Sequence, residues 1–133
     1  MIEVQNLTKT KINKTELRKI AERVLRKEKG KGKDLSLVLV GPQRMRKLSK
    51  IYRGKDVLAN VLSFQGEGFL LGEVVLCPSV IRKDALEYKI PFQGALCWML
   101  VHGLLHLLGY SHETLKQETI MTKKEQQYLS TAS

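Results

Sequence analysis

The sequence has few of the features that mark secreted, membrane-bound or disulfide-rich proteins. It contains only two cysteines, Cys77 and Cys97, and they form no CxxC pair, so we expect two reduced thiols. The first residues, 1–5, lack the basic start and apolar core of a signal peptide, and no apolar run reaches spanning length. These absences predict a cytoplasmic protein that does not associate with a membrane.

Internal repeats, low-complexity segments and linkers rich in proline or serine are also absent from the sequence. A chain of 133 residues is long enough to bury one modest core and short for two. Hydrophobic residues make up 43% of it and charged residues 27%, the balance of a globular rather than a disordered chain. We therefore expect residues 1–133 to fold as a single domain.

Acidic residues are scarce in the N-terminal part of the chain. The formal net charge is +10, and residues 1–55 hold 17 of the 23 Lys and Arg residues but only 5 of the 13 Asp and Glu residues. Two basic clusters, at 9–33 and 44–55, account for most of this excess. A positive field attracts polyanions, nucleic acid above all, although a surface tuned for solubility explains the same composition.

Hydrophobic periodicity predicts alternating strands and helices. We expect strands over four short segments rich in leucine and β-branched residues: 2–5, 35–40, 60–64 and 71–77. The short loop 65–68 predicts a hairpin. Asn13, with Glu16 three residues later, predicts the start of a helix that Gly30 and Gly32 close. Four more helices are expected at 42–52, 78–88, 91–109 and 114–129. This order predicts an α/β or α+β layer fold.

All three histidines lie within eleven residues, at the spacing H-x3-H-x2-G-x2-H. His102 and His106 are four residues apart, so a helix directs both imidazoles to one point. Gly109 can adopt the left-handed backbone that ends a helix, which lets His112 supply a third nitrogen. Three imidazoles with an open fourth position suit catalytic zinc. An isolated histidine is more often a core residue, but this clustering predicts one Zn²⁺ on His102, His106 and His112.

The same spacing is found in the metzincin proteases, where a glutamate after the first histidine acts as general base. Gly103 occupies that position here, which makes a protease the less favoured interpretation. The variant with glycine, followed by G-Y-x-H, resembles the YbeY family of bacterial ribosomal-RNA maturation endoribonucleases.

Further segments carry this resemblance along most of the chain. They are Ile-Tyr-Arg-Gly-Lys-Asp at 51–56, Asn-Val-Leu-Ser-Phe at 60–64, Leu-Gly-Glu-Val-Val-Leu-Cys at 71–77, and Met121 with Glu125. Two positions depart from the family pattern. Ser111 replaces the usual aspartate before the third histidine, and Leu58-Ala59 replaces a threonine or Pro-Thr. Without that aspartate, zinc affinity or turnover is expected to be weaker.

The resemblance implies a mixed four-stranded sheet packed with about five helices, including a metzincin-like zinc helix. It also implies a zinc-dependent, single-strand-specific endoribonuclease that acts in small-subunit rRNA 3′-end maturation and ribosome quality control. Its partners are then ribosomal RNA and the small ribosomal subunit, with no DNA. Arg53 is the expected catalytic residue, because its family counterpart is functionally important and a guanidinium can pair bidentately with a phosphate. A surface arginine at the end of a basic helix is the alternative.

A second class of function stays open, a zinc-stabilised module that binds RNA or the ribosome without hydrolysis. Structural zinc normally has four protein ligands, so a fourth would have to come from Cys77, Cys97 or a carboxylate. Trp98 and Tyr110 could stack on bases, but both lie in the apolar run and are expected in the core.

Overall fold

A computed structural model of the chain describes residues 1–28, 30, 32–56 and 58–130. These residues form one sheet with the strand order β1-β2-β4-β3, whose members are β1 (Ile2–Asn6), β2 (Asp34–Leu39), β3 (Val61–Gln65) and β4 (Leu70–Leu76). Strand β2 pairs in parallel with β1 and β4, whereas β3 pairs antiparallel with β4. The sheet is therefore mixed and four-stranded, and the predicted hairpin joins β3 to β4.

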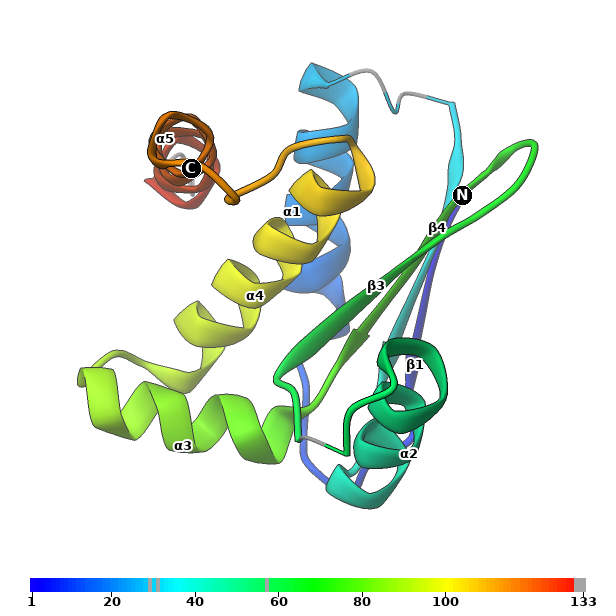
Figure 1. Ribbon diagram of the computed structural model, residues 1–133, viewed down its shortest axis with the longest axis vertical. Helices are drawn as coiled ribbons and strands as arrows, with labels where there is room; N and C mark the ends of the chain where they lie inside the picture. The colour runs from blue at the N-terminus through cyan, green and yellow to red at the C-terminus, as the bar shows by residue number, and fades with distance from the viewer. Residues whose placement is uncertain (29, 31, 57, 131–133) are drawn as a thin grey trace.

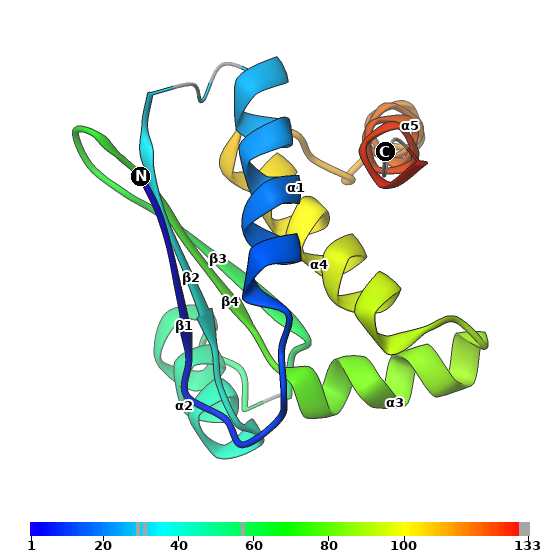
Figure 2. The same cartoon turned by 180° about the vertical axis from the view of Figure 1, so that it is seen from behind.

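Five helices in the described residues surround this sheet: α1 (Lys14–Lys27), α2 (Pro42–Arg53), α3 (Pro78–Tyr88), α4 (Phe92–Leu107) and α5 (Leu115–Ser130). Helices α1 and α4 cover one face of the sheet and α2 lies against the other (Figures 1 and 2). Helix α3 packs against α4, and α5 lies on α4 away from the sheet. The single-domain α+β fold is confirmed.

The main core lies between the sheet and the helices α1 and α4. Alternate residues of β2, Leu35, Leu37 and Leu39, are buried on this side. A smaller cluster around Met45 fills the other side, under α2. Helix α4 is apolar almost all round because neighbouring elements cover most of its surface.

No single helix in the described ranges is long and apolar enough to cross a membrane. The pair α3 and α4 reaches that length and composition together, but it is bent by 114° at the break.

The helix ends agree with most of the predicted signals. Asn13 accepts a hydrogen bond from the backbone nitrogen of Glu16 at 3.1 Å and so caps α1, as predicted. The predicted closure at the glycines 30 and 32 is wrong, because α1 ends at Lys27 with Glu28 as its C-cap. The backbone of Glu28 is no longer helical, and its carboxylate accepts hydrogen bonds from Tyr110 and Tyr128, which lie far along the chain.

Candidate metal centre

The three histidines come together at the C-terminal end of α4. His102 and His106 extend from this helix, and His112 lies in the segment that follows it. One nitrogen from each ring lies within 4.8 Å of the others, and the ring centroids are 4.7 to 5.6 Å apart. Three imidazoles converging in this way form a group that could hold one metal ion.

A hydrogen-bonded turn brings His112 back to the helix. Gly109 has a φ of +101°, the left-handed conformation that the sequence predicted for it. The backbone nitrogen of Tyr110 donates to the carbonyl of Leu105 at 2.9 Å, and that of Gly109 donates to the carbonyl of His106 at 3.1 Å. This pair of bonds is the Schellman arrangement, which satisfies the last carbonyls of a helix while reversing the chain.

A buried carboxylate on α5 orients the first histidine. Glu125 Oε2 lies 2.6 Å from His102 Nδ1, and the side chain of Glu125 is only 9% exposed. The other oxygen, Oε1, accepts a 3.1 Å hydrogen bond from Trp98 Nε1. When Nδ1 of an imidazole donates to a carboxylate, Nε2 is left as the metal-binding nitrogen. Glu125 therefore fixes both the tautomer and the direction of His102.

Electrostatic interactions keep this carboxylate ionised and one histidine neutral. Burial raises the pKa of Glu125, but its bonds with His102 and Trp98 and the nearby imidazoles outweigh burial and lower it. Burial lowers the pKa of His106, and the rings of His102 and His112 lower it further. A neutral imidazole is the form that binds metal, so His106 is ready for this role at neutral pH.

Gly103 allows α4 to lie close to strands β3 and β4. A Cβ atom at this position would lie 2.9 Å from Val74 Cγ1 and 3.0 Å from Ser63 Oγ. The hydroxyl of Ser63 in turn donates a 2.9 Å hydrogen bond to the carbonyl of Gly103. A glutamate here would meet the sheet, so the metzincin general base has no room at its usual position.

A second carboxylate, Glu28, ties the turn after α4 to α1 and α5. It accepts hydrogen bonds from the hydroxyls of Tyr110, at 2.7 Å, and Tyr128, and an ion pair from Lys124 at 3.2 Å. Burial raises the pKa of Glu28, but these hydrogen bonds and the lysine charge outweigh burial and lower it. The Glu28 cluster, formed by these four residues, therefore anchors the segment between His106 and His112.

Arg53 and the two cysteines do not belong to the histidine group. Arg53 ends α2 as an exposed residue, and α2 and α4 cover opposite faces of the sheet (Figure 1). Cys97 is buried and donates a weak 3.5 Å hydrogen bond to Glu16, and burial raises its pKa to about 12. Cys77 is buried at the start of α3. Neither thiol belongs to the histidine group.

Sequence reasoning assigned no role to the two carboxylates that organise the site. Glu125 matches a family pattern, but the sequence does not show what it contacts. Its partners Trp98 and His102 lie on another helix. Glu28 is separated from Tyr110 by 82 positions, and no local pattern relates them. Trp98 and Tyr110 are half-buried rather than fully in the core. The polar atom of each side chain donates a hydrogen bond to a glutamate, Glu125 and Glu28 respectively.

These features define an α+β protein in which one helix and the turn that follows it bring together three histidines that could hold a metal ion. The chain belongs to the family described as endoribonuclease YbeY, whose family model matches residues 3–133.

Similar proteins carry the same family name, and a solved structure shares the fold. The chain is 39% identical to the endoribonuclease YbeY of Bdellovibrio bacteriovorus, over 80% of this chain and 69% of that protein. It is 37% identical to the endoribonuclease YbeY of Vesicomyosocius okutanii, over 98% and 94% of the two chains. The solution structure of TM1509 from Thermotoga maritima superposes with a TM-score of 0.70 at 26% identity, and covers 99% of this chain and 89% of the other.

Proposed function

We propose that this protein is a zinc-dependent endoribonuclease specific for single strands, which acts in the cytoplasm on small-subunit ribosomal RNA. In this proposal it matures the 3′ end of that RNA and takes part in ribosome quality control. Family membership supports the reaction class, because the matching relatives carry the name endoribonuclease. The observation that carries the zinc dependence is the convergence of His102, His106 and His112 within 4.8 Å.

The protein's own residues prepare the site for phosphodiester hydrolysis. Glu125 holds His102 by Nδ1, and the Schellman turn holds His112 beside the helix. His102, His106 and His112 would hold a metal ion, which would supply Lewis-acid stabilisation for negative charge on phosphoryl oxygens. Because the metzincin glutamate is absent at Gly103, this site has no general base at that position.

We propose Arg53 as the residue that pairs with a phosphate of the bound strand. Its guanidinium is exposed at the end of a basic helix. The preceding residue, Tyr52, contacts Phe64 of the edge strand β3 at a centroid distance of 4.9 Å. Ser63, the neighbour of Phe64, faces α4 through its bond to Gly103. An RNA strand that passes around the edge of β3 would meet both Arg53 and the histidines.

Two alternative functions, a structural zinc site and a protease, fit these residues less well. A purely structural zinc site needs a fourth protein ligand, and the group within the described residues has three members. A protease of the metzincin type needs a carboxylate where Gly103 packs against Val74. We therefore keep two alternatives to be tested by experiment. One is an RNA-binding module without hydrolysis, and the other is a protease.

The decisive experiment combines metal analysis with RNA cleavage. Protein purified without a histidine tag should contain about one zinc per chain and should cleave a labelled single-stranded RNA faster than its duplex. A chelator should abolish cleavage, zinc should restore it, and His106→Ala should lack both zinc and activity. RNA binding without chelator-sensitive cleavage would favour the binding module, and cleavage of casein but not RNA would revive the protease.

A further inference from the structure

A small hollow lies beside the histidines, between α4 and α5. Its volume is about 230 Å³, and His102 and His112 form part of its wall. Trp98, Met99 and Met121 supply apolar surface, while Glu118 and Thr122 supply polar groups. This volume is below the usual range of about 300–1,000 Å³ for whole ligands, so the hollow suits one flat ring system rather than a larger molecule.

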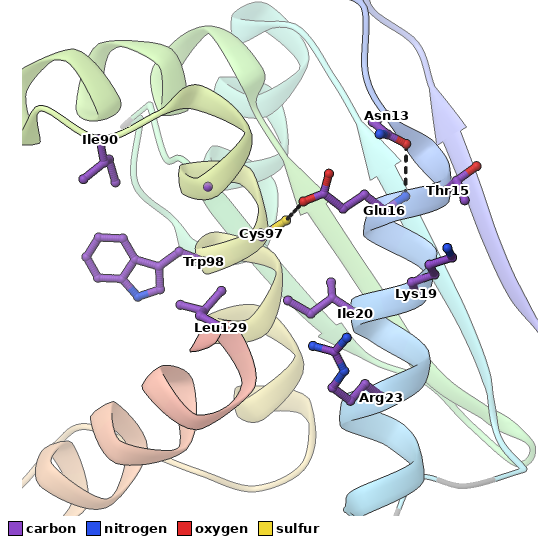
Figure 3. A pocket seen from close by; sticks show the side chains of 11 residues that line it. Asn13, Thr15, Glu16, Lys19, Ile20, Arg23, Ile90, Cys97, Trp98 and Leu129 are labelled. Carbon is purple, nitrogen blue, oxygen red and sulfur yellow. Dashed lines mark hydrogen bonds between the residues drawn. The ribbon is translucent and has the colours of Figure 1, made fainter. Parts of the chain in front are cut away.

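The indole of Trp98 is held in a fixed orientation relative to the metal ligands. Its Nε1 donates to Glu125, the same carboxylate that contacts His102 through its other oxygen. Figure 3 shows the indole projecting from α4 with its nitrogen directed toward α5. Trp98 is only partly buried, so its ring is available for stacking. An aromatic ring held in place is the usual platform for an unpaired base.

The polar side of the hollow can discriminate between bases. Glu118 and Thr122 are exposed, and neither side chain makes a hydrogen bond or ion pair with another residue in the part of the chain that the structure describes. A carboxylate only accepts hydrogen bonds, so it favours bases that carry an amino group. Guanine offers a ring N–H beside its amino group, which matches the two oxygens of a carboxylate. Uracil has no amino group.

We propose that this hollow is a base pocket, which holds one unpaired base next to the phosphate at the metal centre. In it the base stacks on Trp98, and Glu118 selects guanine over uracil. This proposal rests on the proposed function, because it takes single-stranded RNA as the substrate of the same site.

The surroundings of Trp98 provide a path for the rest of the strand. The same indole lines a larger groove of about 750 Å³ between α1 and α4 (Figure 3). Lys19 extends from α1 on one side of this groove and is exposed. A strand with one base in the pocket can therefore continue past Trp98 toward a cation that meets its next phosphate.

Trp98 is the only tryptophan in the sequence, so its fluorescence reports on the pocket directly. The zinc-loaded protein is titrated with 5′-GMP, 5′-UMP and short RNAs that contain a single guanine or none. We expect guanine to quench the fluorescence and to bind about tenfold more tightly than uracil. Glu118→Gln should reduce this preference to about twofold or less, whereas Glu87→Gln, an exposed control on α3, should keep it.

Cleavage kinetics give a second readout. Trp98→Phe keeps an aromatic ring and loses the N–H, so it should retain the preference for guanine at the cleavage site. Trp98→Leu should raise KM about tenfold more than it lowers kcat. Zinc content is measured in each variant, so that a lost metal is not mistaken for a lost base contact.

The outcomes separate the two proposals. A wild-type protein that shows no chelator-sensitive RNA cleavage contradicts the proposed function, whatever the fluorescence shows. A wild-type protein that cleaves RNA, but whose fluorescence and rates are the same for guanine and uracil, overturns the base pocket alone. Equal preference in wild type and Glu118→Gln overturns the role of Glu118.

Discussion

The hydroxyl of Tyr110 donates a 2.7 Å hydrogen bond to Glu28, a residue 82 positions earlier in the chain. Tyr110 is the second residue of the turn that begins at Gly109, and His112 follows two residues later. The same carboxylate is bound by Tyr128 and Lys124 of α5. One acidic side chain at the end of α1 thus connects the turn that carries His112 to the helix that carries Glu125.

Removing the charge of Glu28 should weaken this connection. In Glu28→Gln the ion pair with Lys124 is lost, and two tyrosine hydroxyls share a poorer acceptor. We expect the free energy of unfolding to fall by about 1–3 kcal/mol, measured by urea denaturation of the metal-free protein. The exposed Glu22→Gln on the same helix should change it by less than about 0.5 kcal/mol. Equal effects in the two variants would contradict an anchoring role.

The stabilisation by Glu28 should depend on pH. Its pKa in the folded protein lies below the ordinary 4.5, so the unfolded chain holds the proton more tightly. The contribution of Glu28 to the free energy of unfolding is therefore fully present above pH 4.5, and it is lost as the pH falls through the folded-state pKa. The difference in urea midpoint between wild type and Glu28→Gln should be largest near neutral pH and should shrink in acid. A difference that grows as the pH falls would contradict the lowered pKa of Glu28.

Glu125 should control metal affinity through His102. Glu125→Gln keeps the size of the side chain but removes the charge that orients and polarises the imidazole. We expect zinc affinity to fall about 10- to 100-fold, measured by competition with a chromophoric chelator. Glu87→Gln, on exposed surface, serves as the matched control. Unchanged affinity in Glu125→Gln would show that the 2.6 Å contact has no effect on the metal.

Gly103 should be required for packing. Gly103→Ala places a methyl group within 3.0 Å of Val74 and Ser63, so we expect a loss of about 1–3 kcal/mol in unfolding free energy. Gly94→Ala is the control on the same helix, since a Cβ atom added there would meet no other atom within 4 Å. Helix propensity predicts that this control is neutral or stabilising by up to about 1 kcal/mol. Thermal or urea midpoints distinguish the two.

Arg53 should act on RNA and not on zinc. Arg53→Ala is expected to lower kcat/KM for RNA cleavage by about tenfold or more, because a phosphate loses a bidentate partner. Arg46→Ala removes the same charge from the same helix, where Arg46 forms an exposed 3.8 Å ion pair with Asp56. This control should lower the rate only a few-fold, and both variants should keep their zinc. Equal losses would assign α2 a general electrostatic role.

Local patterns in the sequence predicted the elements with few errors. The helical cap at Asn13, the hairpin between β3 and β4, and the left-handed Gly109 depend on neighbouring residues, so short windows contain the information. The predicted end of α1 was wrong, since the helix ends at Lys27 with Glu28 as its C-cap. The carboxylate of Glu28 accepts hydrogen bonds from Tyr110 and Tyr128, and no short window of the sequence contains these contacts.

The spacing of His102, His106 and His112 by itself determined that three imidazoles would converge, since one helical turn and one glycine turn suffice to bring them together. Only the tertiary structure decided which groups surround them. Glu125 and Trp98 meet because α5 folds onto α4, and Glu28 reaches Tyr110 across the domain. Helix α2, which ends at Arg53, lies on the other face of the sheet from α4. These placements follow from how the layers bury their apolar faces, and burial is a property of the whole chain rather than of any short segment.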